Sequence, residues 1–209
     1  MTILLVRHTQ VALHWRGKCY GTADAGLSRE GHRRAASLAR EIAAWQPDIV
    51  VHSNLRRTRS LARRILAQRI GLAIHADPLW QERDFGCWEA QSWARIHRDS
   101  GNAMDGMITA PDSFRPGGGE TTHELADRAE AAFAALAALP AARIAVITHG
   151  GPIAAILGRR AGLAAHDWLA LVPACGTITR LSRDRPPLSG PFADPRACAA
   201  TVNPQHSRP

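Results

Sequence analysis

The sequence predicts an α/β protein, a three-layer αβα sandwich in which helices cover both faces of a mostly parallel central sheet. Short apolar runs of the kind found in strands buried on both faces alternate with longer segments whose apolar residues have helical spacing. Alternating strands and helices imply parallel pairing, because each helix carries the chain back to the same edge of the sheet. With 209 residues, of which 45% are hydrophobic, the chain is long enough for one well-buried core.

The first predicted strand is the apolar run ILLV at 3–6, and a polar, glycine-containing loop follows it as far as Leu27. Ser28 suits the N-cap of a helix, because its hydroxyl can accept a hydrogen bond from a free backbone N–H. Pro47 follows the end of this helix. The apolar residues of the helix share one face, which we expect to lie on the sheet: Ala35, Leu38, Ile42 and Trp45.

The second predicted strand is DIVV at 48–51. The tripeptide HSN at 52–54 is expected to cap a second helix, which carries apolar residues on one side and ends by Gly71. LAIH at 72–75 is a weaker third strand, and a loop with aromatic and acidic residues follows at 77–89.

The second half of the chain repeats the alternation. A capping box, Thr121-x-x-Glu124, starts an alanine-rich helix that runs through about Leu139. RIAVIT at 143–148 is a strong fourth strand, and another helical pattern follows the histidine and glycines after it. TITRL at 177–181 is the last predicted strand.

The final 27 residues lack this pattern and contain six of the thirteen prolines. A proline-rich segment with little apolar periodicity buries too little surface to fold on its own. The predicted organisation is therefore one domain at 1–182 and a Pro-rich, loosely ordered C-terminal tail at 183–209.

The formal net charge of +8 would by itself suggest nucleic acid or an anionic membrane surface as a partner. Lys18 is the only lysine among the 26 basic residues, and the arginines are scattered over predicted helix faces without a run of five. This distribution favours a solvated, arginine-rich surface. We therefore expect anionic small molecules as partners, and neither nucleic acid nor a membrane.

The four cysteines lie far apart without a CxxC spacing: Cys19, Cys87, Cys175 and Cys198. The chain shows no signal-peptide pattern and no apolar stretch near 18 residues. A disulfide framework is not expected in a chain with this much core. These features predict reduced thiols and a cytoplasmic location.

Basic side chains follow three of the predicted strands. LLVRH ends in Arg7 and His8, AVITH ends in His149, and HSNLRR places Arg56 and Arg57 just after the second strand. In open α/β sheets, ligands bind beyond the carboxyl ends of the strands. A single histidine after a strand is usually a loop residue that binds nothing. Two histidines and two arginines at equivalent strand ends predict one shared polar site.

These residue types indicate phosphate chemistry. The planar guanidinium of arginine pairs with phosphate oxygens and stabilises the charge of a transferring phosphoryl group. A neutral imidazole, with one nitrogen fixed by a backbone carbonyl, can attack phosphorus and form a phosphohistidine. Glu82 is the best-placed acid to protonate the leaving alkoxide, because a bound phosphate dianion would keep a proton on its carboxyl group. Asp84 and Glu89 are expected to be solvated or to cap backbone groups.

A metal site is the rival interpretation of the same residues. His8, His149 and a carboxylate could hold Zn²⁺ or Fe²⁺. Guanidinium groups beside a dication are electrostatically costly unless substrate lies between them. We therefore expect neither a metal nor another cofactor.

Five sequence blocks carry a resemblance to a known family. They are LVRHTQ at 5–10, SNLRRTRSLA at 53–62, WQERDFGCWE at 80–89, GGGE at 117–120 and VITHGGP at 146–152. Each block alone is a weak signal, but the five in this order resemble the motifs of the histidine phosphatase superfamily, also called the phosphoglycerate mutase-like family. The resemblance covers residues 1 to about 182.

The resemblance implies a role for each matched residue. His8 resembles the phosphorylated nucleophile and Glu82 the proton donor. Arg7 and Arg57 resemble phosphate clamps, and His149 resembles the second phosphate-binding histidine.

The resemblance extends beyond the first block, and it also has departures. Tyr20 and Gly21 are implied to border the substrate, and the Gly150 amide to face phosphate. The usual Arg-His-Gly has Thr9 in third place, and the asparagine common a few residues later is His14. Threonine lacks the freedom of glycine at positive φ, so this turn must use an ordinary backbone conformation or bear strain.

RHT followed by KCYG at 18–21 is similar to bacterial α-ribazole-phosphatase-like members, which act late in cobalamin assembly. The resemblance thus implies a metal-independent phosphomonoesterase for a small phosphorylated metabolite, with α-ribazole 5′-phosphate as the specific expectation. The alternatives are a phosphoglycerate-mutase-type phosphotransferase and a non-catalytic protein that binds a phosphate ligand or nucleic acid. The lack of a long insertion to shield a phosphoenzyme from water favours hydrolysis. A homodimer is left open.

Overall fold

The computed structural model describes residues 1–182, so the predicted tail lies outside the described residues. Its centre is a five-stranded sheet with the order β3-β2-β4-β1-β5. β1 to β4 pair in parallel, whereas β5 runs antiparallel to β1 at one edge. The prediction of a mostly parallel sheet is confirmed. The strands are β1 (Thr2–Arg7), β2 (Ile49–His52), β3 (Ala73–Ala76), β4 (Arg143–Thr148) and β5 (Ile178–Ser182).

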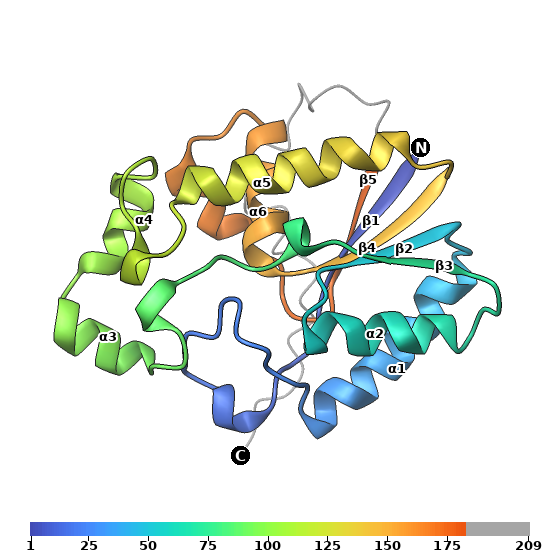
Figure 1. Ribbon diagram of the computed structural model, residues 1–209, viewed down its shortest axis with the longest axis horizontal. Helices are drawn as coiled ribbons and strands as arrows, with labels where there is room; N and C mark the ends of the chain where they lie inside the picture. Colours follow the sequence, from blue (N-terminus) through green and yellow to red (C-terminus); the bar gives the residue numbers. More distant parts are fainter. Residues whose placement is uncertain (183–209) are drawn as a thin grey trace, which may run out of the picture.

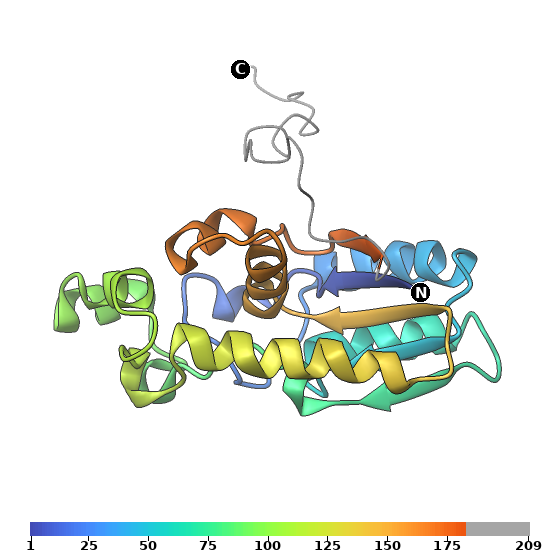
Figure 2. The same cartoon turned by 90° about the horizontal axis from the view of Figure 1, so that it is seen from above.

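Helices cover both faces of the sheet, as the predicted sandwich requires (Figure 1). One face carries α1 (Arg29–Ala44) and α2 (Arg56–Leu66), and the other carries α5 (Thr122–Ala135) and α6 (Gly150–Arg160). Two shorter helices, α3 (Trp93–Ser100) and α4 (Gly106–Thr109), lie to one side of these layers (Figure 2).

Two apolar clusters explain why the strands have continuous apolar sequences. Ile3 and Leu5 of β1 pack on the side of α5 and α6, whereas Leu4 and Val6 pack on the side of α1 and α2. All four side chains are at most 4% exposed. Burying each such side chain contributes about 1.5–3 kcal/mol relative to leaving it in water. The run ends at Arg7, where the strand reaches the carboxyl edge of the sheet.

Two of the three predicted helix starts have the predicted caps. The Ser28 hydroxyl accepts from the N–H of Gly31 at 2.8 Å, and Thr121 and Glu124 form both hydrogen bonds of the capping box. The helix predicted to run to about Leu139 has its α-helical part end at Ala135, followed by a 3₁₀ turn.

The predicted HSN cap is wrong. The N-cap of α2 is Leu55, and no side chain caps this helix. His52 is the last residue of β2, and Asn54 takes a φ of 66° in the turn that follows. The Asn54 N–H donates to Nδ1 of His52, and the Ser53 hydroxyl is used elsewhere, in the site described below.

Three cysteines lie in the described part of the chain, and all three are free: Cys19, Cys87 and Cys175. The reduced state of the thiols stays a prediction, and Cys198 lies outside the described residues. None of the helices within residues 1–182 has the length and apolar character needed to cross a membrane.

Thr9 adopts an ordinary backbone conformation. The non-glycine residues with positive φ in the described chain are Gln46, Asn54 and Ala90, so Thr9 is not among them. Its side chain is fully buried, and its hydroxyl donates to the carbonyl oxygen of Gly31 at 2.8 Å. Threonine in place of the usual glycine therefore adds a hydrogen bond between the turn after His8 and the start of α1, and it causes no backbone strain.

Gly31 at the start of α1 generates the first prediction. Replacing a helical glycine by alanine normally stabilises a helix, but a Cβ at this position would lie 2.0 Å from the carbonyl oxygen of Gln10. We therefore expect Gly31→Ala to lower the free energy of unfolding by about 1–3 kcal/mol, measured by denaturant titration. Ser37→Ala, on the exposed face of the same helix, is the control; equal effects of the two substitutions would contradict this account.

Candidate active site

The carboxyl ends of β1 and β4 bring the two predicted histidines together. Arg7 pairs in register with Thr148, so His8 and His149 follow adjacent strand ends. The two imidazole rings lie 5.1 Å apart between centroids. Both residues are buried, with exposed fractions of 1% and 0%. The expected convergence of residues far apart in the chain is therefore observed.

His8 is held as a neutral imidazole with one free nitrogen. Its Nδ1 lies 2.8 Å from the carbonyl oxygen of Thr9, and because a carbonyl only accepts, Nδ1 must carry the proton. The lone pair of Nε2 is then available. Burial, followed by the positive charge of Arg57, holds the pKa of His8 well below its usual value.

His149 is also neutral, in a tautomer fixed by two partners. Arg57 Nε donates to Nδ1 at 3.2 Å, so Nε2 carries the proton and donates to the Ser53 hydroxyl at 2.7 Å. Burial and then the charge of Arg57 hold the pKa of His149 well below its usual value. Both ring nitrogens are engaged, so a hydrogen bond from His149 to phosphate requires that the phosphate replace one of these partners.

Arg57 is fully buried without a carboxylate partner among the described residues. Its two terminal nitrogens donate to backbone carbonyl oxygens, Nη1 to Ala23 at 2.6 Å and Nη2 to Gly21 at 2.5 Å. The guanidinium also lies over the ring of Tyr20, at 5.2 Å from its centroid. Burial lowers the pKa of Arg57 from that of an exposed arginine, but arginine remains a cation in proteins. The loop at 20–23 therefore surrounds a cation.

Arg7 approaches the same site from β1. Its Nη1 donates to the carbonyl oxygen of Pro173 at 2.5 Å, while its Nε is buried and has no hydrogen-bond partner. A Cβ on Gly150 would lie 3.2 Å from Cζ of Arg7 and 2.8 Å from a methyl of Val172. Glycine at the start of α6 therefore lets the guanidinium lie close to the backbone. A buried donor without an acceptor is a natural contact for an anion.

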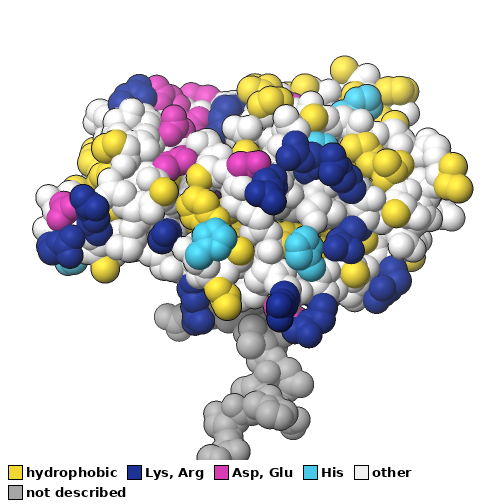
Figure 3. Space-filling view, turned by 60° about the horizontal axis from the view of Figure 1, so that its bottom comes forward, with side chains coloured by type: hydrophobic (Ala, Val, Ile, Leu, Met, Phe, Trp, Pro, Cys, Tyr) yellow, Lys and Arg dark blue, Asp and Glu magenta, His cyan; other side chains and the backbone are white. Residues whose placement is uncertain are grey.

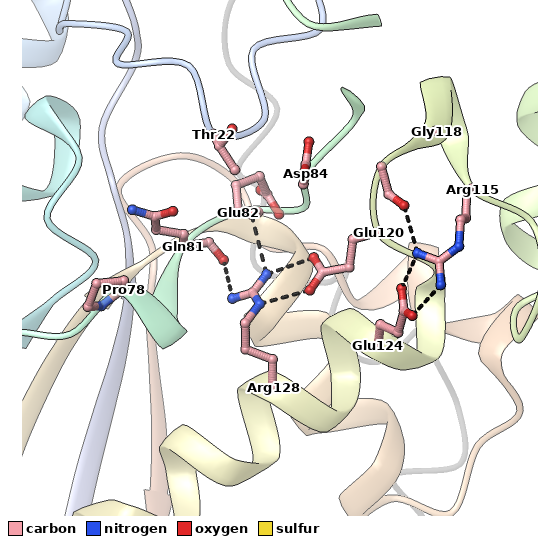
Figure 4. Close-up of a pocket in the computed structure, with 11 residues that line it drawn as sticks. Thr22, Pro78, Gln81, Glu82, Asp84, Arg115, Gly118, Glu120, Glu124 and Arg128 are labelled. Atoms are coloured by element: carbon pink, nitrogen blue, oxygen red, sulfur yellow. Dashed lines mark hydrogen bonds and ion pairs between the residues drawn. The ribbon is translucent and has the colours of Figure 1, made fainter. Parts of the chain in front are cut away.

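Glu82 lies at the N-terminus of α6. Its Oε1 accepts from the N–H of Gly151 at 3.1 Å and from its neighbour Arg83 at 3.0 Å. The N-terminal end of a helix favours a carboxylate, because its free N–H groups carry partial positive charge. Glu82 also lines a cavity of about 460 Å³ together with Thr22, Asp84 and residues of α5 (Figure 4).

Of the predicted substrate-bordering residues, Tyr20 lies edge-on to His8, with ring centroids 6.4 Å apart. The carbonyl oxygen of Gly21 accepts a hydrogen bond from Arg57. A side chain at position 21 would not fit, because its Cβ would lie 2.4 Å from a carboxylate oxygen of Glu89. Glu89 accepts from the backbone of Thr22, and Asp84 from that of Gly86. The prediction that both acids are solvated or capping is confirmed.

Arg56 does not join the site, although its position after β2 predicted that it would. Its side chain turns toward Gly26, at 3.8 Å from where a Cβ would stand, and lines a different cavity. The reason is geometric, since consecutive helical residues point about 100° apart. With Arg57 directed at the histidines, Arg56 must point away. His14, the other departure from the family pattern, is exposed in a 3₁₀ turn.

Ser53 is a site residue that the sequence interpretation missed. Its buried hydroxyl lies 2.9 Å from Thr58 Oγ1 and 2.7 Å from His149 Nε2. HSN was instead interpreted as a helix cap. The available signal was a hydroxyl residue directly after a strand that neighbours the strand ending in His149.

The site therefore combines two guanidiniums and two neutral imidazoles with one carboxylate nearby. Such a site is positively charged and lined by donors, which suits a phosphate dianion. Among the described residues, no three His, Cys, Asp or Glu side chains are grouped so as to hold a metal ion.

The family model of the histidine phosphatase superfamily (branch 1) matches residues 3–189. The chain belongs to this superfamily. It is 28% identical over 179 residues to the glucosyl-3-phosphoglycerate phosphatase of Mycobacterium tuberculosis, covering 81% of this chain and 79% of that protein.

Solved structures of this superfamily share the fold. A mycobacterial glucosyl-3-phosphoglycerate phosphatase superposes with a TM-score of 0.76 at 26% identity, covering 86% of this chain and 88% of that one. The α-ribazole phosphatase from Shigella flexneri gives a TM-score of 0.78 at 22% identity, covering 88% and 92%, and this similarity concerns the fold alone. The histidine phosphatase described here is an enzyme that acts on phosphorylated small molecules.

The buried neutral histidines generate a prediction about stability and pH. The unfolded chain binds protons at His8 and His149 near pH 6.5, whereas the folded chain does not, because both pKa values are lowered. The unfolded state therefore gains protons as the pH falls below about 6.5, and the free energy of unfolding decreases by up to about 1.4 kcal/mol per pH unit for each histidine. Denaturant titrations between about pH 7 and pH 5 measure this slope.

His8→Asn should make that slope shallower, whatever it does to stability at neutral pH. Ser37→Ala, which removes no titratable group from the exposed face of α1, should leave the slope unchanged. An unchanged slope in His8→Asn would show that His8 is protonated in the folded protein.

Proposed function

We propose that this histidine phosphatase is a metal-independent phosphomonoesterase that works through a phosphohistidine at His8. The observation that carries the proposal is the state of His8. The ring is neutral, its Nδ1 is fixed by the Thr9 carbonyl at 2.8 Å, and its free Nε2 belongs to a ring that lies beside that of His149. Such an imidazole is oriented and deprotonated for attack without a further base.

In the first step, Nε2 of His8 attacks phosphorus and the bond from phosphorus to the ester oxygen breaks. Arg7 and Arg57 neutralise the oxygens of the transferring group, and the unpartnered Nε of Arg7 supports this role. The leaving alkoxide takes the proton of Glu82 and departs as an alcohol. His8 then carries the phosphoryl group and a positive charge, which the Thr9 carbonyl stabilises.

In the second step, water attacks phosphorus and the bond to Nε2 breaks. Glu82, now a carboxylate, takes a proton from the attacking water, so that both catalytic groups return to their starting state. Orthophosphate is released. No cofactor is needed, because imidazole supplies the nucleophile and guanidiniums supply the positive charge. Hydrolysis is favoured over a mutase reaction because the sequence has no obvious long insertion that could shield a phosphoenzyme from water.

For the substrate, we infer a leaving group without negative charge. If Glu82 protonates the leaving oxygen, the leaving group enters the cavity that Glu82 lines. The two guanidiniums of that cavity are already paired, Arg128 with both oxygens of Glu120 at 2.8 Å and Arg115 with both oxygens of Glu124 (Figure 4).

The charge left unpaired in the cavity is the carboxylate of Asp84, because Glu82 carries a proton when the substrate binds. Asp84 accepts from the backbone N–H of Gly86. A second anionic group on the substrate would meet the charge of Asp84 in a partly enclosed space. A neutral nucleoside such as that of α-ribazole 5′-phosphate avoids this repulsion, and the RHT and KCYG blocks independently favour it. A glyceric acid ester, the substrate class in the mycobacterial relatives' name, is the competing proposal.

The catalytic proposal predicts hydrolysis of p-nitrophenyl phosphate at undiminished rate in EDTA, and loss of that activity in His8→Ala. The reason is that the nucleophile is a protein nitrogen. Rapid acid-free quenching with labelled substrate should trap a phosphoprotein that is stable in base and labile in acid. Full activity of His8→Ala, loss of wild-type activity on chelation, or an acid-stable adduct would each exclude the mechanism.

The substrate proposal predicts a preference between two esters that differ mainly by one carboxylate. Glycerol 3-phosphate should be cleaved with a kcat/KM at least about tenfold above that of 3-phosphoglycerate, the effect of about one unfavourable charge contact. Asp84→Asn should narrow this ratio, while Asp99→Asn on α3 should leave it unchanged. If the wild type cleaves both esters with a similar kcat/KM, the proposal of an uncharged leaving group is wrong. The proposed phosphatase mechanism does not depend on this result.

A further inference from the structure

A second cavity, of about 450 Å³, lies between α1, α2 and the loop before α1, and the catalytic residues do not line it. Its lining includes Arg56, Arg59, Arg63 and Arg64 of α2 and His32 of α1, and we call it the arginine groove. No acidic side chain lines it. Figure 3 shows basic side chains gathered on this face of the molecule.

Arg56, Arg59 and Arg63 form a stripe along α2, at spacings of three and four residues, and Arg64 directly follows Arg63. Residues at these spacings are neighbours on a helix surface, so like charges there repel and destabilise the helix. The sequence of α2, RRTRSLARRIL, contains no acidic residue to offset this repulsion. Arg56 is also the first residue of the helix, where the helix dipole disfavours a cation.

The fold does not neutralise these charges. None of the four arginines forms an ion pair within residues 1–182. Arg64 Nε is buried without a partner, and its Nη2 lies 3.3 Å from Nδ1 of His32. Asp24 is the acid in contact with this region, and its Oδ1 accepts the backbone N–H of Arg56 at 2.6 Å, leaving the guanidinium free.

We propose that the arginine groove binds a linear polyphosphate, either inorganic or carried by a nucleotide. Arg56 and Arg63 are seven residues apart in α2, or about 10 Å along the helix axis. This span is too long for one phosphate group and suits a chain of two or more. Guanidiniums are the donors that best match phosphate oxygens.

The groove fits a small polyanion better than a nucleic-acid strand. Its volume is that of a small-molecule site. Binding of single strands relies on aromatic side chains on which bases stack, and no aromatic ring other than His32 lines the groove. This inference is independent of the proposed function, because Arg57 contacts His149 while the neighbouring Arg56 points toward Gly26 and the groove.

The test is calorimetric titration of the whole protein with tripolyphosphate and, separately, with inorganic pyrophosphate, adenosine diphosphate and a single-stranded oligonucleotide. Excess orthophosphate in all samples occupies the catalytic pocket. We expect tripolyphosphate to bind, and to bind about tenfold more weakly to the double variant Arg59→Gln with Arg63→Gln, as expected for two lost charge contacts. If the adenine base does not contribute to binding, adenosine diphosphate binds no more tightly than inorganic pyrophosphate, and the ligand is an inorganic polyphosphate. If adenosine diphosphate binds more tightly than pyrophosphate, the ligand is the polyphosphate group of a nucleotide.

The matched control is the double variant Arg95→Gln with Arg98→Gln on α3, which removes the same charge from exposed arginines elsewhere. It should bind tripolyphosphate like the wild type. The ligand-free melting temperature of the Arg59, Arg63 variant should not fall, because the groove arginines repel one another. Equal binding by both double variants, or tighter binding of the oligonucleotide than of tripolyphosphate, would overturn the proposal.

Discussion

The burial of Arg57 without a carboxylate is the interaction on which the site depends. Removing a charge from water is costly, and proteins usually offset the cost with an opposite charge. Here the guanidinium is held by carbonyl oxygens of Gly21 and Ala23 and by the imidazole of His149. These acceptors are dipoles, so they satisfy the hydrogen bonds and leave the positive charge uncancelled. In the proposed mechanism, that charge is what an incoming phosphate dianion neutralises.

The same charge determines the state of both histidines. A neighbouring cation and complete burial each disfavour the imidazolium form, and they act together on His8 and His149. Arg57 also selects the tautomer of His149, since Arg57 Nε donates to Nδ1, so that Nε2 keeps the proton and donates to the Ser53 hydroxyl. Arg57 therefore keeps both histidines neutral, fixes the tautomer of His149 and holds the loop at 20–23 in place.

Much of this arrangement was predictable from sequence. The mostly parallel pairing follows from the alternation of strand and helix. Strands that end in Arg7, His8 and His149 bring those residues to one edge of a parallel sheet. The roles of Ser53 and Arg56 could not be predicted in this way. The position of a residue after a strand specifies the edge of the sheet, but not which way its side chain points or which distant group it meets. Both residues follow β2, and one enters the site while the other turns to the arginine groove.

The antiparallel strand β5 has a consequence for how the chain acquires its fold. β1 lies between β4 and β5, so the first strand of the described sheet in chain order is flanked by the last two of its strands. The backbone of Arg7 and His8 also accepts the N–H of Gly176. The segment that carries His8 therefore gains its neighbouring strands only after β4 and β5 have been synthesised, and the apolar side chains of β1 lack these strand neighbours until then.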